Sequence, residues 1–97
     1  MSNDNTNRFS WNDAKRRENL VKHGIDFVDV PTVFDGYTLS VDDDRFPYGE
    51  QRFITIGLLR DFVVLIAHTE REGNIRIIHA RKANKATAAR YFASLRD

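Results

Sequence analysis

The stretch over residues 68–83, H-T-E-R-E-G-N-I-R-I-I-H-A-R-K-A, constrains the fold more than any other part of the chain. It predicts the end of one strand, a tight turn over residues 72–74 and the start of the next strand. Gly73 and Asn74 tolerate the positive φ angles that short hairpin loops require. Strands joined by so short a turn are antiparallel neighbours.

Alternate residues of a strand point to opposite faces of its sheet. For the second strand this alternation predicts one face with Ile75, Ile77, His79 and Arg81, and another with Arg76, Ile78, Ala80 and Lys82. Neither face would be purely apolar. That pattern is unusual for a plain half-buried strand and indicates a sheet that carries a charged site.

Four strands are expected in all, over residues 37–41, 52–59, 62–69 and 75–82. The run F-V-V-L-I-A that starts at Phe62 is apolar on both faces, so this strand should be the central one. The short connections predict antiparallel neighbours throughout.

Three helices are expected around the sheet. The first runs from Trp11 or Asn12 to about His23, and Gly24 ends it. The second starts at Asp26, although Pro31 would remove one of its hydrogen bonds. The third spans residues 85–95. The fold class is therefore α+β, with two N-terminal helices, a four-stranded antiparallel sheet and a C-terminal helix, the helices lying on one face.

The length of 97 residues predicts one domain over residues 9–97, with residues 1–8 as a disordered tail. Absence of cysteine excludes disulfides and thiolate metal sites. The polar N-terminus and the lack of a membrane-spanning stretch predict a cytoplasmic protein with no membrane partner. Residues 1–50 carry six Lys/Arg against ten Asp/Glu, whereas residues 51–97 carry nine against four. A basic half fits an anionic partner such as nucleic acid, or an ordinary mixed surface.

Several side chains suit chemistry on a phosphodiester. Metal-free RNA cleavage needs a base for the 2′-hydroxyl, cations for the phosphorane oxygens and an acid for the leaving 5′-oxygen. Histidine titrates near neutral pH, and arginine stays charged and can bind two phosphate oxygens. These residue types occur at Arg52, His68, Arg71, Arg76, Arg81 and Lys82. A histidine at a strand end is more often structural, and Lys22 and His23 could simply complement a helix dipole.

Other kinds of site are not supported by the sequence. The acidic run Asp42–Asp44 lacks the spacing and glycine of a calcium loop, and three separated histidines without cysteine give no zinc spacing. No phosphate-binding glycine loop, nucleophile elbow or cysteine nucleophile is present. We expect no metal and no cofactor.

Six short segments together resemble the BrnT toxins of bacterial BrnT/BrnA toxin–antitoxin pairs. They are F-S-W-N-D-A-K from Phe9, N-L-V-K-H-G-I-D-F from Asn19, T-V-F-D from Thr32, G-E-Q-R-F-I-T-I-G from Gly49, A-H-T-E-R from Ala67 and I-R-I-I-H-A-R-K-A from Ile75. Together, in this order, the six segments extend over nearly the whole domain. The sequence departs from the family pattern at His79, where a small residue is usual, and at Pro31.

The resemblance implies a fold like that of the RelE-type ribonuclease toxins and a metal-independent endoribonuclease that blocks translation. It implies a cognate BrnA-like antitoxin with a ribbon-helix-helix domain, and contact with operator DNA only through that antitoxin. By position it implies functional roles for Arg52, His68, Arg71, Arg76 and Arg81, and weaker ones for Lys22 and His23. We assign catalysis to Arg52, His68, Arg71 and Arg81, with proton transfer by His68, and RNA binding to Lys22, His23, Arg76 and Lys82.

Two other hypotheses remain open. The domain could bind nucleic acid or protein without chemistry and act with its partner as a transcriptional autorepressor. It could also be a purely structural partner that helps a ribbon-helix-helix protein hold its DNA.

Overall fold

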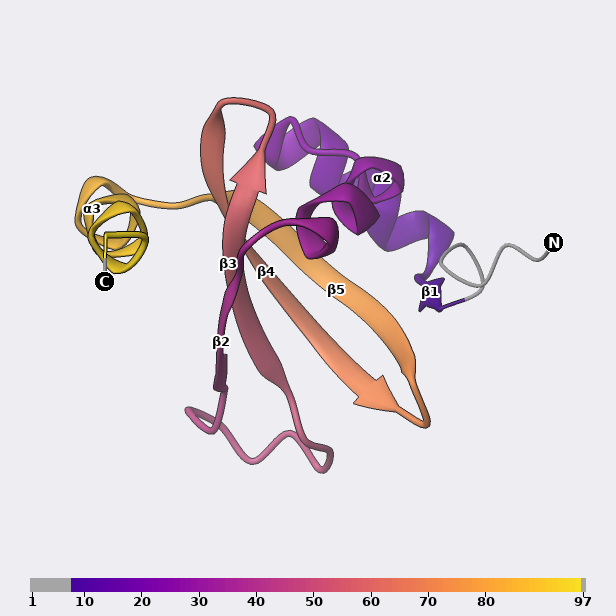
Figure 1. Ribbon diagram of the computed structural model, residues 1–97. Helices are drawn as coiled ribbons and strands as arrows, with labels where there is room; N and C mark the ends of the chain where they lie inside the picture. Colours follow the sequence, from indigo (N-terminus) through magenta and orange to yellow (C-terminus); the bar gives the residue numbers. More distant parts are fainter. Residues whose placement is uncertain (1–7, 97) are drawn as a thin grey trace, which may run out of the picture.

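A computed structural model describes residues 8–96 of the chain. The element order is β1 (Phe9–Ser10), α2 (Asp13–His23), η1 (Phe27–Asp35), β2 (Leu39–Asp42), β3 (Phe53–Leu59), β4 (Phe62–Arg71), β5 (Asn74–Lys82) and α3 (Lys85–Ser94). The α+β class is confirmed (Figure 1). The tail expected over residues 1–8 lies outside the described residues except for Arg8, whose carbonyl accepts a 2.6 Å hydrogen bond from the Ile75 amide.

The sheet has five strands in the order β1-β5-β4-β3-β2, so the prediction of four antiparallel strands is wrong in part. The four longer strands pair antiparallel as expected, and β1 adds to β5 in parallel, with Phe9 opposite Ile75. A two-residue strand has too little sequence for an alternating pattern. Its partner also lies more than sixty residues away, so nothing local announces it.

The second predicted helix is a 3₁₀ helix, η1, rather than an α-helix. Asp26 caps it as expected, because its carboxylate accepts from the Val28 amide at 3.1 Å. Pro31 lies inside it. Proline donates no backbone hydrogen bond, and its ring clashes with the carbonyl four residues earlier in an α-helix, which accounts for the change of helix type.

The ends of the other two helices lie within two residues of the expected ones. The Asn12 side chain caps α2 by accepting from the Lys15 amide at 3.0 Å, and Gly24 ends it in the left-handed region at φ 73°. Asn84 caps α3 by accepting from the Thr87 amide at 2.8 Å. None of the helices among residues 8–96 has the length and apolar composition needed to span a bilayer.

The hydrophobic core lies between η1 and one face of the sheet. Phe27, Val30 and Val33 of η1 are buried against Val64, Ile66 and other sheet residues. The Cβ of any larger residue at Gly57 would lie 2.7 Å from Val33 Cγ1, so glycine is what allows η1 to approach β3 this closely. We call the sheet face that packs on η1 the closed face, and its opposite the open face.

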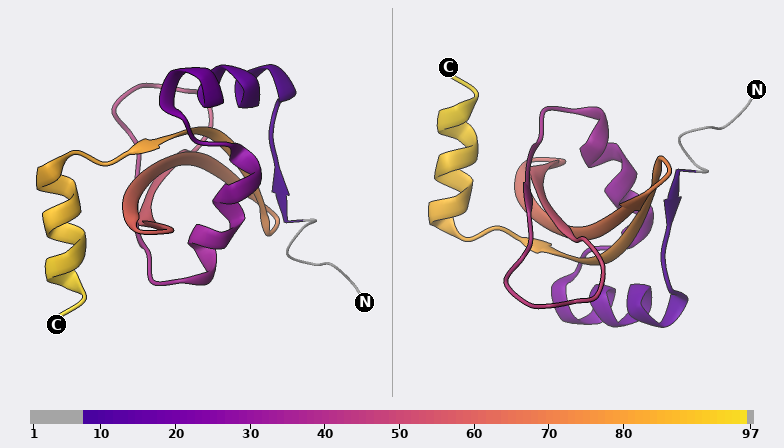
Figure 2. Two further views of the ribbon diagram at one scale, coloured as in Figure 1. Left: turned by 90° about the horizontal axis from the view of Figure 1, so that it is seen from above. Right: turned by 90° about the horizontal axis from the view of Figure 1, so that it is seen from below.

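The prediction that the helices share one face is wrong. Figure 2 shows η1 inside the curve of the sheet, α2 on the outer side of β5, and α3 standing away from both. The buried Asn19 explains the placement of α2, because its side-chain amide forms hydrogen bonds with the backbone N–H and C=O of Ala80 at 3.1 and 2.8 Å. Asn19 thus takes the place of a neighbouring strand where β1 has ended.

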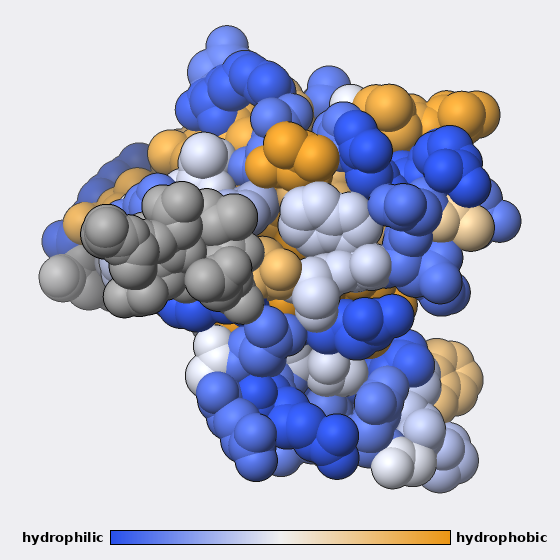
Figure 3. Space-filling model, turned by 90° about the vertical axis from the view of Figure 1, so that its right-hand side faces the viewer, coloured by the Kyte–Doolittle hydropathy of each residue, from blue (hydrophilic) through white to orange (hydrophobic). Residues whose placement is uncertain are grey.

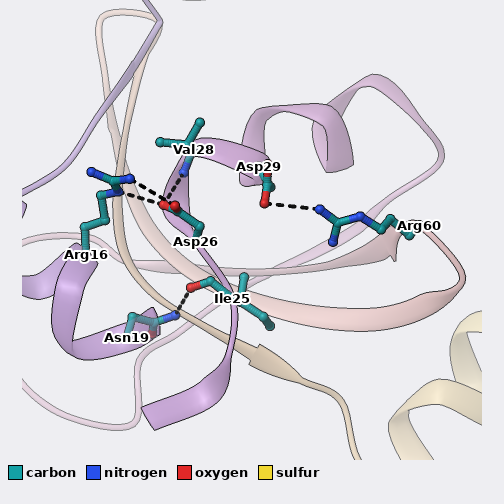
Figure 4. Close-up of polar contacts among 7 residues, drawn as sticks. All are labelled: Arg16, Asn19, Ile25, Asp26, Val28, Asp29 and Arg60. Carbon is teal, nitrogen blue, oxygen red and sulfur yellow. Dashed lines mark hydrogen bonds and ion pairs between the residues drawn. The ribbon is translucent and has the colours of Figure 1, made fainter. Parts of the chain in front are cut away.

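The short connection from α2 to η1 is held by polar contacts (Figure 4). Asn19 also donates to the Ile25 carbonyl at 2.9 Å, and Arg16 grips the Asp26 carboxylate at 2.7 and 3.0 Å. The Arg16 guanidinium holds the pKa of Asp26 below its ordinary value. In the first turn of η1, Asp29 contacts Arg60 at 3.3 Å.

A β-bulge in β5 overturns the predicted division of its side chains. His68 pairs with Ile77 and Ala67 pairs with His79, so Ile78 is an extra residue with no partner on β4. A bulge shifts the alternation of the residues that follow. Ile75, Ile77 and Ala80 are therefore buried together in the core, and His79 and Arg81 line a hollow on the open face.

Candidate functional site

The eight residues predicted to act on RNA fall into two groups and one outlier. The first group, where the β2–β3 loop meets the far end of β4 and the start of β5, is Arg52, His68, Arg71 and Arg76. The second group, at the end of α2 and in the second half of β5, is Lys22, His23 and Arg81. The outlier is Lys82, whose ammonium is 4.8 Å from the Phe62 ring centre. A cation over an aromatic face is satisfied there without a ligand.

A hollow of about 650 Å³ lies at the end of the sheet beside the first group. Arg71 and Arg76 line it together with the acidic side chains of Glu50, Glu70 and Glu72. Hydrophilic side chains cover the lower end of the molecule in the view of Figure 3. The hollow is therefore polar and carries both signs of charge. Its arginines suit phosphate oxygens, and its carboxylates can accept hydrogen bonds from hydroxyl groups.

Arg52 lies beside this hollow and is held in place by two contacts. Its guanidinium carbon sits 4.0 Å from the centre of the Tyr48 ring, and its Nη2 is 3.3 Å from Glu50. Its Nε is buried and has no hydrogen-bond partner among residues 8–96. A stacked guanidinium keeps its planar edge directed, which favours bidentate contact with an anion.

His68 is fully buried on the closed face, a position that sequence alone did not predict. Its Nε2 lies 2.6 Å from Thr55 Oγ1, and its ring contacts those of Phe34 and Phe53. Burial lowers its pKa, and the charge of Glu70, whose Oε2 is 3.7 Å from Nδ1, acts in the opposite sense. Because this neutral imidazole has no exposed surface, it cannot touch a ligand in the hollow directly. Glu70, which lines the hollow, lies between the two.

The second group contains a residue that was not assigned to the site. His79 Nε2 lies 3.1 Å from His23 Nε2, and the two rings meet edge to face with centres 4.8 Å apart. Burial lowers the pKa of His79, and the neighbouring charges of His23, Arg81 and Lys22 lower it further. Arg81 shares a hollow of about 350 Å³ with His79 on the open face.

Three contributors to these groups were missed from the sequence. Glu70 was not singled out, although it lies in the H-T-E-R segment and lines the hollow of Arg71 and Arg76. Tyr48 was hidden in a polar loop, and its role depends on the fold of that loop over Arg52. His79 was singled out only as a departure from a family pattern, and its pairing with His23 spans fifty-six positions.

No trio of His, Asp or Glu side chains within residues 8–96 lies close enough to hold a metal ion together. The charged atoms available to a ligand in the two groups are the guanidinium, ammonium, imidazole and carboxylate groups described above. What this arrangement can do is bind an anionic, hydroxyl-bearing ligand at two places and offer it imidazole.

The sequence model of a protein family, the ribonuclease toxin BrnT of type II toxin–antitoxin systems, matches residues 11–86, which is most of the chain. The chain belongs to the BrnT family of ribonuclease toxins. The matched segment takes in both groups of candidate residues, from Lys22 to Arg81. A search of curated proteins found no match.

Proposed function

We propose that the protein is a metal-independent endoribonuclease that cleaves RNA in the cytoplasm, inhibits translation and is neutralised by a cognate antitoxin. The observation that carries the proposal is the convergence of Arg52, Arg71 and Arg76 around a polar hollow in a chain of the BrnT family. Arginines at fixed positions can stabilise the charge on phosphorane oxygens without a metal ion.

In this proposal Arg52, Arg71 and Arg76 bind the RNA backbone at the end of the sheet. Arg81 stabilises negative charge further along β5. Its partner Leu65 lies four residues along β4 from Thr69, the partner of Arg76, or about 13 Å at the usual rise of a strand. Lys22 adds positive charge from the last turn of α2, and His23 beside it adds an imidazole. One RNA strand of a few nucleotides spans both groups.

Proton transfer by His68 stays a prediction, and the structure supplies an obstacle to it. No part of the His68 side chain is exposed, and aromatic rings pack on it from two elements. A direct role would require η1 to move away from the closed face. Removal of the His68 imidazole should therefore lower stability before it lowers a rate of proton transfer.

The antitoxin in this proposal is a BrnA-like ribbon-helix-helix protein, which covers the basic groups and alone contacts the operator DNA. The support for this part is the toxin–antitoxin family. Co-expression with the small protein encoded beside the toxin gene should restore growth and yield a stable complex. A toxin that stays lethal alongside a well-expressed ribbon-helix-helix neighbour would contradict it.

The test of the function is purified protein against total RNA in excess EDTA. The parent should cleave RNA, and the Arg71→Ala/Arg76→Ala double variant should lose cleavage by about 10²-fold or more. Arg90→Ala, which removes an exposed arginine of α3, is the matched control and should cleave like the parent. Salt-dependent binding without cleavage by any of the three, including on translating ribosomes, would favour the binding-module alternative instead.

A further inference from the structure

The contact between His23 and His79 joins two elements at the border of the open face. His23 ends α2, and His79 follows the bulge of β5, so their Nε2 atoms meet 3.1 Å apart across the strand edge. Both side chains are half-buried. His79 lines two hollows at once, one against α2 and the other against β3 and β4.

The groups that face His79 are four cations, three carboxylates and His23. From α2 they are Lys15, Glu18, Lys22 and His23; from β2 and its loop they are Asp42, Asp43 and Arg45; from β5 there is Arg81. Asp43 is engaged by Arg45 at 2.7 and 3.0 Å and by the Tyr48 hydroxyl at 3.2 Å, so its charge is compensated. The net field disfavours a proton on His79 and favours an anion beside it.

We propose that His79 is a catalytic residue that accepts the 2′-hydroxyl proton of RNA, and that His23 is a positioning residue that orients the His79 ring. This inference rests on the proposed ribonuclease function and names the proton acceptor in it. The geometry supports it because His79 is the histidine that lies on the open face beside Arg81.

The proposed step is a transesterification in which atoms and charge balance. A ring nitrogen of neutral His79 takes the proton of the 2′-hydroxyl, and the 2′-oxygen forms a bond to phosphorus. The bond from phosphorus to the 5′-oxygen breaks, and its electron pair goes to that oxygen, which takes a proton from water. The hydroxide left behind takes the proton from the His79 imidazolium. The products are a 2′,3′-cyclic phosphate and a free 5′-hydroxyl.

A purely structural clasp between α2 and β5 explains the surroundings less well. Asn19 already fastens α2 to β5 through two hydrogen bonds to Ala80. Burial and the nearby charges of Arg81 and Lys22 lower the pKa of His79, which disfavours a proton there that would strengthen the clasp. The same cations suit a site whose ligand brings negative charge and whose imidazole must be neutral near pH 7.

The test measures single-turnover cleavage of a labelled RNA in EDTA from pH 5 to 8.5, with affinity for its uncleavable 2′-deoxy analogue measured in parallel. His79→Gln should lower the cleavage rate by about 10²- to 10⁴-fold and leave the affinity within about threefold. The rate of the parent should fall on the acid side with a midpoint below pH 6.5, and the variant should lack that fall. His23→Gln should keep the fall but shift its midpoint, with a loss of about tenfold.

Each outcome decides between the two proposals. A parent that cleaves RNA and a folded His79→Gln protein that cleaves within about threefold of it would overturn the role of His79 alone. A parent that never cleaves RNA would overturn the ribonuclease function and this inference together. His79→Ala serves as the second variant if His79→Gln fails to fold, and a lower Tm with an unchanged rate in either would assign His79 a structural role only.

Discussion

His68 and His79 lie on neighbouring strands of one sheet, yet they face opposite ways. Ala67 is the residue paired with His79 and the neighbour of His68. Burial is the first cause of a lowered pKa in both. His68 is enclosed by the rings of Phe34 and Phe53, whereas His79 faces Arg81 and Lys22 at half-buried hollows. A lowered pKa therefore does not identify a site, because core packing and a cationic ligand site produce the same shift.

The largest difference between the two faces should appear in stability. Phe27 is fully buried against the closed face, and Phe27→Ala should lower the free energy of unfolding by about 3–5 kcal/mol. Val41 is 58% exposed on the open-face side, and Val41→Ala should change the free energy of unfolding by no more than about 0.5 kcal/mol. Urea unfolding of both variants checks this, and similar losses would show that the open face is packed as well.

Substitutions on the open face should lower the rate of RNA cleavage more than they lower stability. Arg81→Ala should lower RNA cleavage by about 10²- to 10³-fold, or about 2.7–4 kcal/mol of transition-state stabilisation, because a fixed cation near the phosphorane is lost. Arg60→Ala, at the β3–β4 turn, is the control and should leave cleavage unchanged. Rates of the two variants in EDTA provide the measurement, and full activity in Arg81→Ala would move the site away from the open face.

The edge between the two faces should show an intermediate effect. Asn19→Ala leaves the Ala80 backbone groups and the Ile25 carbonyl without their partner, and should cost about 2 kcal/mol. It should also lower RNA cleavage, because α2 would no longer hold His23 against His79. Arg17→Ala, exposed on the same helix, is the matched control for both measurements. An Asn19→Ala protein that is less stable but fully active would show that the position of α2 does not affect the site.

The smallest expected effect is the pH dependence of stability. His68 has a lowered pKa when folded, so below pH 6.5 the unfolded chain binds more protons than the native one. Stability should then fall as the pH drops from 6.5 to 5, by at most about 1.4 kcal/mol per pH unit for one group. His68→Leu should remove part of this slope and leave the part due to His79. Identical slopes in the parent and His68→Leu would mean that His68 titrates normally.

Local chemistry in the sequence predicted most of the helix ends and the antiparallel strands. The caps at Asn12 and Asp26 and the left-handed Gly24 depend on residues only a few positions apart. The parallel pairing of β1 and the placement of α2 depend on contacts across some sixty positions, such as Asn19 with Ala80. No periodicity within a short window carries that information.

The candidate site was accessible from the sequence only as a set of residue types and a family resemblance. The arginines were identified, but simple alternation placed Arg76 and Arg81 on opposite faces, whereas the bulge at Ile78 puts both on the side opposite to Ile77. The loop that brings Tyr48 onto Arg52 was not predicted either. The burial of His68 follows from η1 closing over it. Each of these depends on tertiary packing rather than on spacing along the chain.

The extra residue at Ile78 also determines how this surface can change during evolution. Deleting that one residue would leave His79 next to Ile77 and still opposite Ala67, so His79 and Arg81 would stay on the open face. Loss of Ile78 would thus change the local bend and twist of β5 and leave the sides of its other side chains unchanged. Among natural variants of this chain, a β5 that lacks the residue at position 78 should keep the same two faces.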